Sequence, residues 1–143
     1  MTARVCVLGP SGKMGRAVIS AAAGRSDLAV TSAVDRHGAP GLCEAVVPGV
    51  FSTSDLDSGL SAADVYVDFT TPDATRVVAS VARGRRMHAV IGTTGLSPEA
   101  EAALAALAEV APIVVAANFS LGVNLVLGLV RTAARVLGPD WDA

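Results

Sequence analysis

A glycine-rich segment near the start of the chain constrains its fold more than any other feature. Residues 4–8 read RVCVL, an apolar run typical of a buried strand, and residues 9–15 read GPSGKMG. A helical pattern follows over residues 14–23. Glycines allow a tight turn and a close backbone approach because they carry no Cβ. This order predicts the first half of a βαβ unit, with a helix N-terminus that can hold a dinucleotide pyrophosphate. Because the spacing is G-x-x-G-x-x-G, an ordinary glycine turn is the alternative.

Apolar runs and helical patterns alternate along the rest of the chain, as they do in βαβ folds. Residues 42–60 are weakly patterned, and we expect a loop there apart from one short strand. The right-handed crossover rule then predicts a single α/β domain over residues 1–143, a Rossmann-type doubly wound parallel sheet with helices on both faces. The predicted strands cover residues 29–34, 50–53, 65–69, 89–91 and 113–116, and the later helices cover residues 72–83, 97–108 and 121–137.

Composition and charge exclude several classes of protein. The net charge of −2 favours neither nucleic acid nor an acidic membrane surface as a partner. Residues 110–130 carry no charge and are long enough to span a bilayer. Pro112, Asn118 and Asn124 interrupt this run, so we do not expect a membrane-spanning helix. The two cysteines show no metal-ligand spacing, so we expect no metal, and Cys6 should be a buried thiol. The chain begins without a signal-peptide pattern, so we expect a cytoplasmic protein.

The helix predicted over residues 121–137 is apolar on most of its faces. Such a helix needs cover on more than one side. It either lies flat on the sheet, or something beyond residue 143 also packs against it and the helix leads toward a further domain.

An acidic residue closes the second predicted strand. Asp35 stands about twenty residues beyond the glycine loop, where a carboxylate accepts the ribose hydroxyls of a dinucleotide. Its neighbour Arg36 could instead meet a 2′-phosphate. The alternative is a solvated Asp-Arg turn. Asp68, at the end of a later strand, is expected only to cap the turn at Thr70 and Thr71.

Two further loops follow predicted strands. They read IGTTG at residues 91–95 and AANFS at residues 116–120. Ligands of open α/β sheets bind outside the carboxyl ends of the strands, so we expect both loops to line one cleft. Their amide and hydroxyl groups could bind a ring amide or a substrate carboxylate. As bare patterns, they could equally be helix caps.

Four segments together resemble the dihydrodipicolinate reductase family: GPSGKMG at residues 9–15, VDFT at 67–70, HAVIGTTG at 88–95 and ANFSLGVN at 117–124. The resemblance implies a reductase of the diaminopimelate and lysine route that uses NADH or NADPH. Its substrate would be a cyclic imine derived from aspartate semialdehyde and pyruvate, and its product tetrahydrodipicolinate. It also implies a homo-oligomeric full-length enzyme, with a small-molecule substrate as its other partner.

The resemblance also assigns the binding residues. It places the pyrophosphate against Gly9, Pro10, Ser11, Gly12, Lys13 and Met14, and the adenosine ribose against Asp35 and Arg36. It places the nicotinamide against Gly92, Thr93, Thr94, Ala116, Ala117, Asn118 and Phe119. Thr94 is in addition the candidate for the substrate carboxylate.

The chain departs from the family in its catalytic signature. The family carries a His-His-x-x-Lys run followed by Pro-Ser-Gly-Thr, and neither occurs here. His37 and His88 are isolated, as a loop residue and a strand-edge residue, and Lys13, the only lysine, belongs to the glycine loop. We therefore expect no catalytic residue in this chain, a substrate domain that is absent, and no activity of the chain alone. One alternative is a non-catalytic NAD(P)H-binding module. The other is a different Rossmann enzyme, such as homoserine or aspartate dehydrogenase, which the motifs of the two later loops disfavour.

Overall fold

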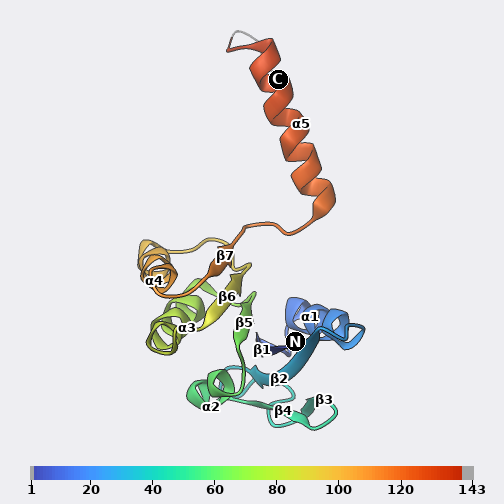
Figure 1. Ribbon diagram of the computed structural model, residues 1–143, viewed down its shortest axis with the longest axis vertical. Helices are drawn as coiled ribbons and strands as arrows, with labels where there is room; N and C mark the ends of the chain where they lie inside the picture. Colours follow the sequence, from blue (N-terminus) through green and yellow to red (C-terminus); the bar gives the residue numbers. More distant parts are fainter. Residues whose placement is uncertain (1, 140–143) are drawn as a thin grey trace.

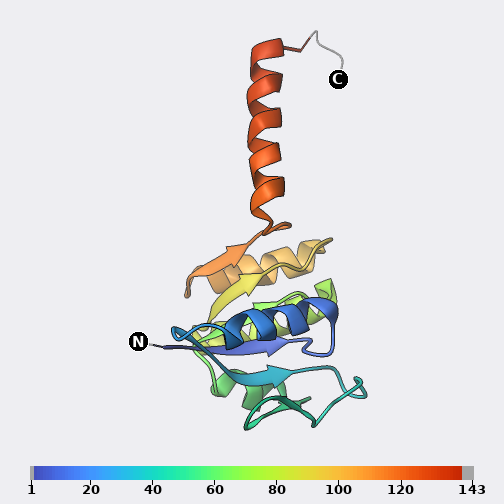
Figure 2. The ribbon, with the colours of Figure 1, turned by 90° about the vertical axis from the view of Figure 1, so that its right-hand side faces the viewer.

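The computed structural model describes residues 2–139 as one seven-stranded sheet in the order β3-β4-β2-β1-β5-β6-β7 (Figures 1 and 2). All neighbouring strands are parallel except β3 and β4, which are antiparallel. The strands are β1 (Ala3–Leu8), β2 (Leu28–Val34), β3 (Ala45–Val47), β4 (Val50–Thr53), β5 (Val65–Asp68), β6 (His88–Ile91) and β7 (Ile113–Val115). The helices are α1 (Lys13–Ala23), α2 (Leu56–Ser61), α3 (Pro72–Arg85), α4 (Pro98–Ala108) and α5 (Leu121–Leu137).

The Rossmann-type doubly wound sheet is confirmed. α1 lies on one face of the sheet, and α2, α3 and α4 lie on the other (Figures 1 and 2). Each strand and helix predicted from the apolar pattern is present, with bounds that differ by at most two residues. α3 and α4 each begin with a proline. Proline lacks a backbone N–H, and at the first helical position this costs nothing because an N–H there has no acceptor within the helix.

The expectation of a loop over most of residues 42–60 was wrong. Pro48 and Gly49 join β3 to β4 in a tight hairpin, in which Gly49 takes a positive φ of 80°. The short helix α2 then begins after Asp55, whose carboxylate accepts hydrogen bonds from the backbone N–H of Asp57 and Ser58. These elements are too short to show a period, so turn and cap residues were the only signals of their presence.

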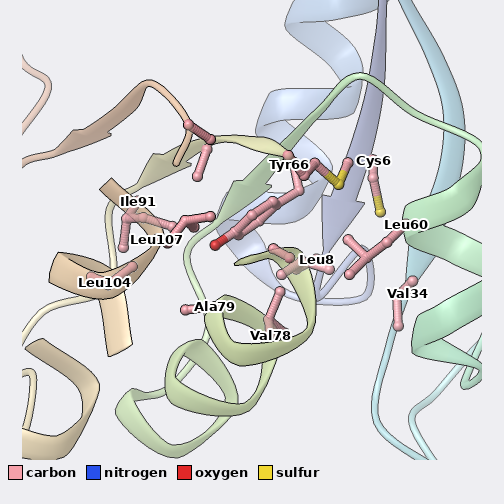
Figure 3. Close-up of a cluster of buried hydrophobic side chains, with 14 residues drawn as sticks. Cys6, Leu8, Val34, Leu60, Tyr66, Val78, Ala79, Ile91, Leu104 and Leu107 are labelled. Atoms are coloured by element: carbon pink, nitrogen blue, oxygen red, sulfur yellow. The ribbon is translucent and has the colours of Figure 1, made fainter. Parts of the chain in front are cut away.

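The main hydrophobic core lies between the sheet and the helices α2, α3 and α4 (Figure 3). Alternation along β5 turns Tyr66 and Asp68 into this layer, while Val65 and Val67 face the α1 side and are half-buried. Cys6 is buried as predicted, and its burial raises the pKa of the thiol to about 11. The cluster comprises Cys6, Leu8, Val34, Leu60, Tyr66, Val78, Ala79, Ala82, Met87, Ala89, Ile91, Leu104, Leu107 and Ala111.

The last helix does not lie flat on the sheet, so that reading of the sequence was wrong. α5 runs away from the β7 edge (Figures 1 and 2), and all of its residues are exposed, with Leu121 at 89%. Its first turn is capped by Ser120, which accepts from the N–H of Val123. An apolar pattern indicates that a helix packs against another surface, but it does not identify that surface. Here the segment after β7 directs α5 away from the sheet. Within residues 2–139 no helix is long and apolar enough to cross a membrane.

Candidate dinucleotide-binding site

The predicted binding residues gather at one edge of the sheet. β1, β2, β5, β6 and β7 run parallel, so their carboxyl ends share that edge. The loops that follow β1, β2, β6 and β7 carry residues 9–12, 35–36, 92–94 and 116–119, and residues 13–14 open α1. This is the edge at which open α/β sheets bind their ligands.

The glycine loop is hydrogen-bonded to β2 and to the residue that follows it, through Gly9 and Ser11. Gly9 takes a positive φ of 65°, and its N–H donates to the carbonyl oxygen of Val34 at 2.8 Å. The Gly9 carbonyl in turn accepts from the N–H of Gly12 at 3.0 Å, which closes a tight turn. The N–H of Ser11 donates to Asp35 Oδ2 at 3.1 Å, so the loop is also held to the end of β2.

Two glycines of this loop serve different purposes. A Cβ at Gly15 would lie 2.8 Å from both Gly9 C and Pro10 Cα, so Gly15 is required for the helix to pack against the loop. A Cβ at Gly12 would meet only the Gly9 carbonyl oxygen, at 3.2 Å, and Gly12 has an extended backbone that other residues adopt. The space beyond Gly12 is therefore open, and its missing side chain leaves the approach to the helix free.

α1 has an uncapped N-terminus. Among the helices that the structure describes, α2, α3, α4 and α5 begin with side-chain caps from Asp55, Thr71, Ser97 and Ser120. The N-cap of α1 is Gly12, which has no side chain to offer. The first N–H groups of α1 therefore keep their hydrogen-bonding capacity, and the helix dipole makes this end favourable for an anion.

Asp35 is oriented by two backbone hydrogen bonds. Its Oδ2 accepts from Ser11 N and its Oδ1 from Arg36 N, at 3.1 and 2.8 Å. A carboxylate has about four acceptor positions, so both oxygens can still accept from a ligand hydroxyl. The backbone N–H of Asp35 donates to Thr53 O at 2.9 Å, which holds the residue against β4.

A cleft of about 470 Å³ opens beside this carboxylate. Three of the predicted binding residues, Pro10, Ser11 and Asp35, line this cleft, whereas Arg36 is exposed and is not among its lining residues. Arg16 was not predicted from the sequence, and it lines the cleft together with Ile19 and Ser20. Their i, i+3, i+4 spacing places them on one face of α1 and was the available signal. The other lining residues are Pro40, Gly41, Glu44, Ala45, Val46 and Ser52.

The loops after β5, β6 and β7 meet around Phe69. A Cβ at Gly92 would lie 2.6 Å from Phe69 Cζ and closer still to two other ring atoms, so the ring packs directly on this glycine. The Phe119 ring contacts Phe69 edge to face, with centroids 5.7 Å apart. The backbone N–H of Ala116 donates to Ile91 O, which continues the pairing of β6 and β7 into the loop.

The remaining predicted residues lie on these same loops. Thr93 is buried, whereas Thr94 and Ala117 are exposed at the edge. The Asn118 side-chain oxygen accepts from Ser120 N at 3.1 Å, and its backbone carbonyl accepts from Asn124 Nδ2 at 3.4 Å. The AANFS segment is therefore partly a helix cap, as the bare pattern allowed.

Comparison with known proteins identifies the family. The family described as "Dihydrodipicolinate reductase, N-terminus" matches residues 3–119. This chain belongs to the dihydrodipicolinate reductase family.

Individual members of the family match nearly the whole chain. A 4-hydroxy-tetrahydrodipicolinate reductase from Nitrosospira multiformis is 40% identical over 147 residues, covering 99% of this chain and 55% of that protein. One from Alkalilimnicola ehrlichii is 42% identical, covering 99% and 56%. The solved structure of a dipicolinate-bound dihydrodipicolinate reductase from Paenisporosarcina sp. TG-14 superposes with a TM-score of 0.80 at 27% identity, covering 94% of this chain and 54% of that one. The chain thus spans about half the length of these relatives.

The two histidines of this reductase-family chain do not come together. His88 is the first residue of β6, at the opposite edge of the sheet from the glycine loop. His37 is exposed in the loop that follows β2. Lys13, which the sequence placed in the glycine loop, is the first residue of α1. Within residues 2–139 no three His, Cys, Asp or Glu side chains gather to form a metal site.

Proposed function

We propose that this chain binds NADH or NADPH and forms the dinucleotide-binding domain of a 4-hydroxy-tetrahydrodipicolinate reductase. That enzyme would transfer hydride to the cyclic unsaturated imine and give tetrahydrodipicolinate, in diaminopimelate and lysine biosynthesis. The observation that carries the proposal is the uncapped N-terminus of α1 behind a glycine loop that is hydrogen-bonded to Asp35. The relatives at 40–42% identity are named 4-hydroxy-tetrahydrodipicolinate reductases, which supports the choice of reaction.

The glycine loop would receive the pyrophosphate. The free N–H groups of Lys13 and Met14 lie in the first turn of α1, and Gly12 leaves their approach open. The Lys13 ammonium can add a charge-assisted contact to a phosphate oxygen. Gly9, Pro10 and Ser11 would support the phosphates as a rigid turn, because their backbone is already hydrogen-bonded to β2 and to Asp35.

The cleft beside Asp35 would hold the adenosine ribose. Asp35 can accept from both ribose hydroxyls, which favours NADH, and its charge repels a 2′-phosphate. Arg36 would offset that repulsion through a charge-assisted contact worth roughly 1.5–3 kcal/mol when well formed. Arg16 lines the cleft and is a second cation within this half of the site.

The loops after β6 and β7 would flank the nicotinamide, whose role when bound is to supply the hydride. Gly92, Thr93 and Thr94 lie on one loop, and Ala116, Ala117, Asn118 and Phe119 lie on the other. The Phe69–Phe119 pair would exclude water from one side of the ring. Thr94 is exposed and has a hydroxyl that can donate to a substrate carboxylate.

The proton that completes the reduction would come from outside these loops. The lysine and both histidines of the chain lie elsewhere, on α1, in the loop after β2 and at the opposite sheet edge. We therefore assign no catalytic residue to this chain and expect a separate substrate-binding domain to supply the general acid. By the same family reasoning we propose a homo-oligomeric cytoplasmic enzyme as its working form.

Replacement of Gly12 by valine tests dinucleotide binding. The extended backbone at Gly12 suits a β-branched residue, and only one contact at 3.2 Å must relax, so the domain should still fold. The branched side chain would enter the phosphate path and weaken NADH by about tenfold or more, equivalent to at least about 1.4 kcal/mol. Gly24→Val, at the other end of α1, is the matched control, because a Cβ there meets nothing within 4 Å.

NADH fluorescence titration and calorimetry give the affinities, and circular dichroism checks the fold. Tight NADH binding by the wild type and the Gly24 variant, with loss in the Gly12 variant, supports the proposal. Wild-type affinity in a folded Gly12→Val protein would mean that the phosphates bind elsewhere.

The roles of Arg16 and Arg36 can be distinguished by their effects on the relative affinities for NADH and NADPH. Because the Asp35 and Arg36 effects oppose each other, NADH and NADPH should bind within about tenfold of one another. Arg36→Ala should weaken NADPH selectively, and Asp35→Ala should weaken NADH selectively. Arg16→Ala serves as the comparison. If it lowers NADPH affinity and Arg36→Ala does not, the 2′-phosphate contact belongs to α1 and our assignment of Arg36 is wrong.

A further inference from the structure

Asp68 is a fully buried carboxylate at the last position of β5. Within residues 2–139 it forms no ion pair with an Arg, Lys or His side chain. A buried carboxylate is costly unless hydrogen-bond donors replace its water. The hydrogen-bond donors around its carboxylate therefore identify the segments that Asp68 holds in place.

Three threonines supply those donors, and they come from three segments. Thr70, in the loop after β5, donates to Oδ1 through its N–H at 2.9 Å and its hydroxyl at 2.5 Å. Thr75, in the first turns of α3, donates its hydroxyl to Oδ2 at 2.7 Å. Thr93, in the loop after β6, lies with its hydroxyl 3.2 Å from Oδ1. Asp68 thus caps the Thr70 turn, as the sequence indicated, but it also holds two further segments.

The hydroxyl protons determine how the network is oriented. Each threonine hydroxyl has one proton and can also accept hydrogen bonds. If all three protons point to the carboxylate, the oxygen of Thr93 can still accept from Thr70 N, which lies 3.1 Å away. The hydroxyl oxygens of Thr75 and Thr93 are 3.0 Å apart. Asp68 is the one acceptor that all three share, so the arrangement depends on its two oxygens.

The consequence for the β6 loop follows from the burial of Thr93. Its side chain is 4% exposed and points into the network, while the next residue, Thr94, is exposed. The backbone adds a second connection, because Gly92 N donates to Asp68 O at 2.8 Å. The loop is therefore anchored on its inner side by one residue of β5 and presents its outer side at the ligand edge.

We propose that Asp68 is a positioning residue whose buried carboxylate holds the loop of Gly92, Thr93 and Thr94 in the conformation that receives the nicotinamide end of the dinucleotide. This inference rests on the proposed function. It predicts that loss of the Asp68 charge affects one end of the ligand and not the other, because the glycine loop and Asp35 are held by separate hydrogen bonds.

The test uses Asp68→Asn, which keeps the shape of the side chain but replaces one acceptor oxygen by an NH₂ donor. Asp64→Asn is the matched control, because Asp64 is exposed and directly precedes β5, at the opposite end of the strand from Asp68. The probes are NADH and ADP-ribose, which shares the adenosine and pyrophosphate groups but has no nicotinamide. Amide hydrogen exchange at Thr93 and Thr94, measured without ligand, reports on the loop itself.

Asp68→Asn should bind NADH about tenfold more weakly, the loss expected when a charged hydrogen bond is removed. Its affinity for ADP-ribose should stay within about twofold of the wild type, and the Thr93 and Thr94 amides should exchange faster. Unchanged NADH affinity, or an equal loss for both probes, would overturn the positioning role. If the wild type binds neither probe, the proposed function fails and this inference falls with it. If the wild type binds both probes but Asp68→Asn does not weaken NADH binding selectively, only the proposed role of Asp68 is wrong.

Discussion

Gly15→Ala tests how closely α1 packs on the glycine loop. A Cβ at this position would lie 2.8 Å from Gly9 C and from Pro10 Cα, and closer still to the Gly9 carbonyl oxygen. All three atoms belong to the backbone, so no side chain can rotate away. Ordinary contact begins near 3.4 Å, and the loop or the helix must therefore move by roughly half an ångström or more.

Two free-energy terms of opposite sign compete in this variant. Alanine in a helix interior is about 1 kcal/mol more favourable than glycine. Overpacking of a close contact costs about 1–3 kcal/mol, and sometimes more. Because the contact is with backbone that is itself hydrogen-bonded to β2, we expect the upper part of that range. The free energy of unfolding should therefore fall by roughly 1–2 kcal/mol.

Gly84→Ala is the matched control for the helix-propensity term. Gly84 lies in the last turn of α3, and a Cβ there would meet nothing within 4 Å. The same substitution should raise the free energy of unfolding by roughly 0.5–1 kcal/mol. Urea denaturation followed by circular dichroism measures both variants, with an unchanged slope showing that the unfolding transition is the same. A Gly15→Ala protein as stable as the wild type would show that the loop yields freely, which contradicts the close packing argued here.

Three further outcomes can be checked on the same protein. The 143-residue chain should not reduce the dihydrodipicolinate precursor at a useful rate, because loss of a general acid alone costs about 10²–10⁴-fold; turnover near that of a full-length relative would show that this chain holds the catalytic groups. Leu107→Ala should lower the free energy of unfolding by about 2–5 kcal/mol, since Leu107 is fully buried, whereas Leu121→Ala, at 89% exposure, should change it by less than about 0.5 kcal/mol. The Arg4 guanidinium, by hydrogen bonding, lowers the pKa of Asp64 to about 2, so this pair stabilises the fold above the ordinary carboxyl pKa of 3.8 and loses its effect as the pH falls toward 2. The stability difference between wild type and Asp64→Asn should therefore shrink over that window, and a difference that is constant with pH would contradict the pairing.

The regular part of the fold was predictable because its signals are long and local. The parallel strands β1, β2, β5 and β6 are mostly apolar, and α3 and α4 open with Pro72 and Pro98. β3 and α2 were missed because three to six residues carry no period, and only the Pro48-Gly49 turn and the Asp55 cap indicated them.

The placement of α5 was not predictable for a different reason. Its apolar residues fit the face of a sheet as well as they fit any other apolar surface, so the pattern could not choose between them. What directs the helix is the short segment between β7 and Ser120, where Asn118 caps the turn. The AANFS motif marks this turn, but hydrophobic periodicity does not indicate the direction in which the following helix leaves it.

The candidate site shows the same division between local and long-range information. The glycine loop and Asp35 follow consecutive strands and could be proposed as binding residues from spacing, whereas Arg16 required knowing which face of α1 meets the cleft. Asp68 looked like a turn cap because its sequence neighbours Thr70 and Thr71 explained it. Its further role depends on Thr93, which is distant in the sequence and reaches it only through the parallel pairing of β5 with β6.

The two halves of the site differ in how completely this chain builds them. At the end proposed for the adenosine, the loop, the uncapped helix and Asp35 are fixed by backbone hydrogen bonds and border a defined cleft. At the end proposed for the nicotinamide, Thr94 and Phe119 are exposed on the loops after β6 and β7. Binding energy from the first half can therefore be large while the reacting end stays open to water. A reductase needs that end enclosed, because hydride and proton transfer require a positioned and dry environment. On the function proposed above, the chain would bind the dinucleotide by itself and would depend on another surface for the chemistry.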